Sequence, residues 1–154
     1  MSPPEEKLAA LGLALPAATA PVANYVGYVV SGRTVYISGQ LPFRDGSMAH
    51  PGRLGAGLAV EDGYAAARQC GLNILAQLKA ACGGDLGRVA RVVRLGGFVN
   101  CTPDFTDIPK CVNGASDLMV AAFGEAGRHT RAAVGVASLP AGAAVEVDAI
   151  VELQ

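Results

Sequence analysis

The sequence contains no tryptophan, few other aromatic residues and few charges, and each shortage excludes something. Aromatic residues make up 5% of the 154 residues and glycine occurs 20 times, so the core must be built from Ala, Val and Leu with close backbone contacts. Only 16% of the residues are charged, and 12 basic side chains are balanced by 13 acidic ones. Because no basic surface field is available to hold a polyanion, nucleic acid is not an expected partner.

Metal-binding and disulfide patterns are missing as well. The four cysteines include no C-x-x-C pair and His50 and His129 lie far apart, so we expect no metal site and four free thiols. The uncharged stretch 8–32 is interrupted by Pro16 and Pro21 and follows an acidic leader, which is unlike a secretory or membrane segment. We therefore expect a cytoplasmic protein that does not associate with a membrane.

The hydrophobic residues that are present, 51% of the chain, follow both strand and helix periodicities. In chain order the pattern predicts a helix over 3–16, a hairpin of strands 22–30 and 35–40, a loop over 41–57, a helix over 61–82, a strand over 89–99, a helix within 109–123, and strands 131–139 and 144–153 paired across a turn at 140–142. After the extension at 1–16, residues 17–154 form one domain. Its order, β-β-α-β-α-β-β, describes an α+β fold in which one sheet carries two helices on one face.

Two helices shield only one face of such a sheet. On the last strand the second face holds Glu146, Asp148, Ile150 and Glu152, and residues 131–139 are apolar on both sides. An uncovered apolar patch favours self-association, most simply as a closed cyclic oligomer.

The run from His129 to Pro140 (HTRAAVGVASLP), followed by Val145-Glu146-Val147 and preceded by ISGQLP at 37–42, resembles the signature of the RidA family (YjgF/YER057c/UK114). The resemblance covers the chain from about Val22 to Leu153. It implies a chorismate-mutase-like fold with one mixed sheet, and a homotrimer whose clefts between subunits bind small carboxylates. It also implies a hydrolase acting on C–N bonds, which converts reactive enamines or imines such as 2-aminoacrylate to a 2-keto acid and ammonia without a cofactor.

The resemblance also assigns roles to residues. Arg131 takes the position of the carboxylate-binding arginine and Glu146 that of the glutamate that handles the water. The substrate-binding positions correspond to Tyr25, Ser38, Gly39, Asn113 and Ala133. This chain departs from the common pattern at Ala133, where many deaminating members have Cys, at His129, where they have Pro or Ala, and in its N-terminal helix. These departures suggest a divergent branch, with the exact substrate left open.

Without the family resemblance, the same residues also allow purely structural interpretations. Arg131 is by default a structural ion pair with Glu146 or Asp148, His129 an exposed loop residue, and Cys101 a buried inert thiol. If residues 139 and 144 pair, Glu146 faces Ala137 and lies about 20 Å along the strands from Arg131, so a site that uses both residues combines two subunits. The competing functions are a non-catalytic trimeric module that binds a small carboxylate and, with less support, an endoribonuclease.

Overall fold

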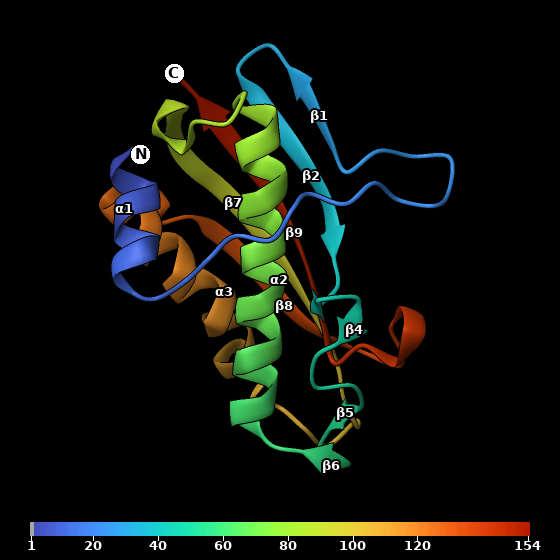
Figure 1. Ribbon diagram of the computed structural model, residues 1–154. Coiled ribbons are helices and arrows are strands. Elements are labelled where there is room, and N and C mark those ends of the chain that lie inside the picture. The colour runs from blue at the N-terminus through green and yellow to red at the C-terminus, as the bar shows by residue number, and fades with distance from the viewer. Residues whose placement is uncertain (1) are drawn as a thin grey trace.

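A computed structural model describes residues 2–154 and shows one main sheet with two long helices packed on it (Figure 1). The sheet has five strands in the order β1-β2-β9-β7-β8, in which β7 and β8 are parallel and the other neighbours antiparallel. Its strands are β1 (Tyr28–Ser31), β2 (Thr34–Gln40), β7 (Val89–Asn100), β8 (Thr130–Val136) and β9 (Val145–Leu153). The helices are α1 (Pro3–Ala10), α2 (Val60–Ala81) and α3 (Ile108–Phe123).

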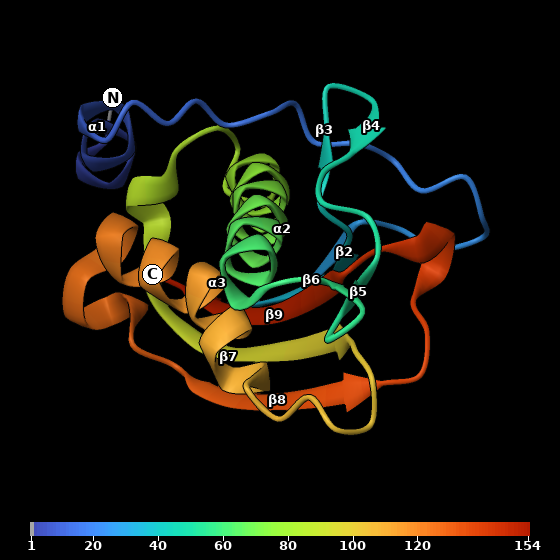
Figure 2. The ribbon, with the colours of Figure 1, turned by 90° about the horizontal axis from the view of Figure 1, so that it is seen from below.

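Helices α2 and α3 lie side by side on one face of the sheet and leave the other face bare (Figure 2). The alternation along β9 explains this layering, because Val145, Val147 and Val151 are fully buried while Glu146, Asp148, Ile150 and Glu152 are partly exposed. From α2, Ile74 and Leu75 complete the core beneath them. The α+β fold with a mixed sheet and two helices on one face is therefore confirmed.

Helices α2 and α3 approach closely because small residues face one another. A Cβ atom added at Gly114 on α3 would overlap the backbone carbonyl of Tyr64 on α2. One at Gly71 on α2 would come within 2.9 Å of the Leu118 side chain on α3. Glycine at these positions sets the height of α3 above the sheet, and with it the position of the polar residues on α3 that face β8.

The pairing predicted for the last two strands is wrong. Strand β9 does not pair with β8 but enters between β2 and β7, so β8 becomes an edge strand. Glu146 consequently faces Phe98 on β7, and not Ala137. The physical reason is that α3 is a crossover that returns β8 parallel to β7, which leaves the buried, alternating residues of β9 to fill the centre of the sheet.

The N-terminal third also differs from the prediction. Helix α1 ends at Ala10 instead of reaching residue 16, and strand β1 begins only at Tyr28, after an irregular segment that replaces the predicted strand from residue 22. Buried Leu8 docks α1 on the core. Prolines at 16 and 21 prevent a regular ladder across this segment.

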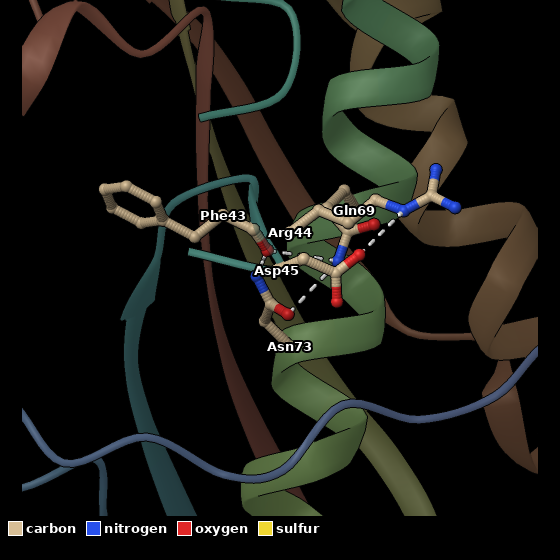
Figure 3. Close-up of polar contacts among 5 residues, drawn as sticks. All are labelled: Phe43, Arg44, Asp45, Gln69 and Asn73. Carbon is tan, nitrogen blue, oxygen red and sulfur yellow. Dashed lines mark hydrogen bonds and ion pairs between the residues drawn. The ribbon is translucent and has the colours of Figure 1, made fainter. Parts of the chain in front are cut away.

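The predicted loop 41–57 contains four two-residue strands, β3 (Phe43–Arg44), β4 (Ser47–Met48), β5 (Arg53–Leu54) and β6 (Gly57–Leu58). The last of these extends one residue beyond the predicted end of the loop. The side-chain amides of Gln69 and Asn73 on α2 both donate to the carbonyl oxygen of Phe43, at 3.2 and 3.0 Å (Figure 3). These contacts hold the β3–β4 hairpin against α2. In the described part of the chain, the helices are too short or too polar to cross a membrane.

Candidate functional site

Arg131 lies at the centre of a hydrogen-bonded cluster between the edge strand β8 and helix α3. Its Nη1 donates to Asn113 Oδ1 at 2.8 Å and to Ser116 Oγ at 3.1 Å. The Ser116 hydroxyl also lies 2.8 Å from His129 Nε2, and His129 Nδ1 lies 2.7 Å from the carbonyl oxygen of Gly127. We call Asn113, Ser116, His129 and Arg131 the Arg131 cluster; all four side chains belong to partly exposed residues.

The Arg131 guanidinium has no carboxylate partner within 4.0 Å among residues 2–154. The default ion pair with Glu146 or Asp148 is absent because these carboxylates extend from the other face of the sheet. Burial, together with the positive charge of Arg131, lowers the pKa of His129 in spite of its hydrogen bond to Gly127, so the imidazole is neutral at pH 7. The cluster therefore carries one positive charge that no carboxylate of residues 2–154 neutralises by direct contact.

A second group of predicted residues gathers on the bare face of the sheet. A Cβ atom at Gly39 would lie 2.9 Å from the Glu146 carboxyl carbon, so the absence of a side chain there makes room for the carboxylate. The neighbouring Ser38 hydroxyl donates to the carbonyl oxygen of Val26 at 2.6 Å, and the adjoining Tyr25 is 59% exposed. Burial and the nearby Asp148 raise the pKa of Glu146.

The two groups do not meet within one copy of the chain. Arg131 is in register with Leu95 and Ala149, which are buried on the helix side of the sheet, whereas Glu146 and Gly39 lie on the bare side. The separation of Arg131 and Glu146 predicted from a hairpin of β8 and β9 is wrong, because that hairpin does not form. The two side chains are kept apart instead by lying on opposite faces of the sheet. Ala133, two residues after Arg131 on β8, shares its face and packs against the core.

Sequence reasoning missed Ser116 and treated His129 as a loop residue. A signal for Ser116 was available, because residues three apart on a helix share a face, and Asn113 was already a candidate. Two cavities of about 300 and 540 Å³ lie on the outer side of α2, around residues such as Phe43, Asp45 and Arg68. Within residues 2–154, no three His, Cys, Asp or Glu side chains converge to share a metal ion.

Comparisons with known proteins agree on the family. Residues 5–153 match the family model described as "YjgF/chorismate_mutase-like, putative endoribonuclease". Protein TCP17 of Trypanosoma cruzi is 58% identical over 144 residues, which are 93% of this chain and 89% of that protein. The crystal structure of Atu1372 from Agrobacterium tumefaciens, whose function is described as unknown, is 48% identical with a TM-score of 0.93, over 98% of this chain and 92% of that one. RidA from the Antarctic bacterium Psychrobacter is 34% identical with a TM-score of 0.58, over 88% and 94%. The chain thus belongs to the YjgF/RidA family.

Proposed function

We propose that this protein is a RidA-type deaminase that hydrolyses amino-acid-derived enamines or imines of the 2-aminoacrylate type to a 2-keto acid and ammonia. The observation that carries the proposal is the way Arg131 is held. Both hydrogens of Nη1 are engaged by Asn113 and Ser116, and no other acceptor among residues 2–154 contacts the guanidinium. The edge formed by Nε and Nη2 is therefore available to grip a substrate carboxylate with two parallel hydrogen bonds.

The chemistry requires little beyond this grip. An imine carbon is already electrophilic, so a substrate held by its carboxylate needs only a positioned water and a group that exchanges protons with it. Glu146 is a suitable carboxyl group, because its raised pKa brings it closer to the operating pH than an ordinary glutamate.

A homotrimer with sites between subunits would unite the two groups. The Arg131 cluster lies at the edge of one protomer, whereas Glu146 lies on the bare sheet face, where Val29, Tyr36 and Val134 are 45–51% exposed. An apolar face of this kind favours burial against a second copy of the chain. Packing the edge of one subunit on the bare face of the next would bring Arg131 of one chain to Glu146 of another.

Turnover is measured as release of ammonia and 2-keto acid from enzymatically generated 2-iminopropionate. Loss of a charge-assisted contact worth about 1.5–3 kcal/mol should make kcat/KM of Arg131→Ala about 10- to 100-fold lower. Arg128→Ala is the matched control, because Arg128 is 72% exposed and three residues away. No wild-type turnover alongside Arg131-dependent binding of pyruvate would instead indicate a non-catalytic carboxylate-binding module. RNA cleavage that Arg131→Ala abolishes would indicate an endoribonuclease.

The shared site is tested by mixing two impaired variants, Arg131→Ala and Glu146→Gln, after reversible dissociation. In a randomly mixed trimer, about a quarter of the interfaces combine an intact Arg131 with an intact Glu146, and activity should return to about that fraction. No recovery in a mixture shown to contain mixed oligomers contradicts a site between subunits.

A further inference from the structure

Ser116 and His129 form a hydrogen-bonded serine–histidine pair whose direction is fixed by the surrounding groups. The carbonyl oxygen of Gly127 can only accept, so His129 Nδ1 carries the ring proton and donates it at 2.7 Å. His129 Nε2 of the neutral ring is then an acceptor, and the Ser116 hydroxyl donates to it at 2.8 Å. The Gly127 carbonyl oxygen thus orients the His129 ring through a hydrogen bond, in the way that a carboxylate orients the catalytic histidine in many hydrolases.

The second neighbour of Ser116 restricts the hydroxyl further. Arg131 Nη1 donates to Ser116 Oγ at 3.1 Å and occupies one of its two lone pairs. The hydroxyl proton is committed to His129, so the one remaining lone pair can only accept a hydrogen bond from a third molecule. Toward a ligand held on Arg131, the Ser116 hydroxyl therefore accepts a hydrogen bond and does not donate one.

The electrostatics and exposure of the pair suit this role. The positive charge of Arg131 next to Oγ stabilises negative charge that develops on the serine oxygen as its proton moves away. Burial and the same charge lower the pKa of His129, so the favoured form of the ring is the neutral one, with the unprotonated Nε2 that the relay requires. Ser116 and His129 both remain partly exposed, as Arg131 does, so water can reach the cluster.

We propose that Ser116 and His129 are a proton relay for the reaction at Arg131, with Ser116 Oγ receiving a proton from the attacking water and His129 Nε2 as its final acceptor. The inference rests on the proposed deaminase function and assigns chemistry to two residues outside the set taken from the family resemblance. It places a proton-handling group in the same protomer as the carboxylate-binding arginine, in addition to Glu146 of the neighbouring subunit.

The step balances as follows for a protonated 2-imino acid. The water oxygen bonds to C2 and the C=N electron pair moves to nitrogen, while one water proton passes to Ser116 Oγ and the serine proton passes to His129 Nε2. The proton then returns by the same path to the nitrogen and the C–N bond breaks. A carbonyl forms from the carbinol oxygen, and its remaining proton leaves with ammonia as ammonium. No oxidant, metal or cofactor enters the step.

The decisive variant is His129→Gln. A glutamine amide oxygen can still accept the Ser116 hydrogen bond and so keep Ser116 and Arg131 in place, but it cannot take up a proton. Loss of general acid–base catalysis should lower kcat on 2-iminopropionate by about 100-fold or more. The Kd for pyruvate, which measures the integrity of the Arg131 grip, should change less than about 3-fold, within the range of one neutral hydrogen bond.

Two further variants separate the relay from a structural role. Ser116→Ala removes the connection and should lose kcat as His129→Gln does, whereas Ser116→Thr keeps a hydroxyl and should retain most of it. Normal wild-type turnover with unchanged kcat in His129→Gln overturns the relay while leaving the deaminase proposal intact. Parallel loss of pyruvate affinity and kcat in His129→Gln also overturns the relay, because it shows that the pair only positions Arg131. No wild-type turnover overturns the deaminase proposal and the relay together.

Discussion

The close approach of α2 and α3 predicts that one alanine substitution destabilises the protein while the same change nearby does not. Gly114→Ala directs a methyl group at the backbone carbonyl of Tyr64, which cannot rotate aside, so the two helices must separate. Overpacking costs up to about 3 kcal/mol. The gain in helix propensity returns about 1 kcal/mol, which leaves a net loss of about 2 kcal/mol. For a chain of this length the melting temperature should fall by about 4–8 °C.

Gly71→Ala is the matched control across the same interface. Its methyl group meets the end of the Leu118 side chain at 2.9 Å, and Leu118 can adjust its rotamer. The same gain in helix propensity then offsets the strain, and the melting temperature should stay within about 2 °C of wild type. Thermal unfolding followed by circular dichroism measures both. Equal shifts in the two variants, or a more stable Gly114→Ala, would refute the conclusion that backbone contact at Gly114 sets the helix spacing.

Three other substitutions test the surroundings of the candidate site and of α1. Gly39→Ala should push the Glu146 carboxylate aside and lower kcat at unchanged stability, so a wild-type rate would contradict the contact. Glu146→Gln should raise the free energy of unfolding at pH 8 and not at pH 4. A raised folded-state pKa means that the ionised carboxyl destabilises the fold as pH rises, and urea titrations at both pH values measure this. Glu5→Gln should do the opposite, with a loss at pH 7 that shrinks as pH falls below the ordinary pKa of a glutamate and through the lowered pKa of Glu5. Burial alone would raise the pKa of Glu5, but hydrogen bonds from Ser2 and Leu86 and the charge of Lys79 lower it overall. A pH-independent difference in urea titrations of Glu5→Gln would argue against this balance.

Local signals predicted the elements that local interactions determine. Helix α2 was predictable because acidic residues open it, apolar residues recur on one face, and Gly83 and Gly84, both with positive φ, end it. The hairpin of β1 and β2 was predictable from its two-residue turn at Gly32. Residues 22–27 have strand-like side chains but form no ladder, because their bonds to β2 are limited to those from Ser38 to the carbonyl oxygens of Val26 and Gly27.

The position of β9 and the composition of the Arg131 cluster depend on tertiary contacts that no short window contains. A three-residue turn after residue 139 suggested neighbouring strands, but β9 leaves this turn to pair with β2 and β7 and not with β8. The family resemblance named Arg131 and Asn113 as separate site residues, and the structure adds the hydrogen bond between them. Ser116 and His129 became visible only when α3 and β8 were placed against each other.

All four members of the Arg131 cluster fall between residues 113 and 131, on one crossover that ends in the edge strand. An edge strand is held by a single neighbour and opens more readily than a central one. Transient detachment of β8 would break the hydrogen bonds that hold Arg131, while the helices and the other four strands of the main sheet stay folded. Amide hydrogen exchange along 130–136 would therefore report how often the support of Arg131 opens, and the proposed assembly with a second copy should slow that exchange.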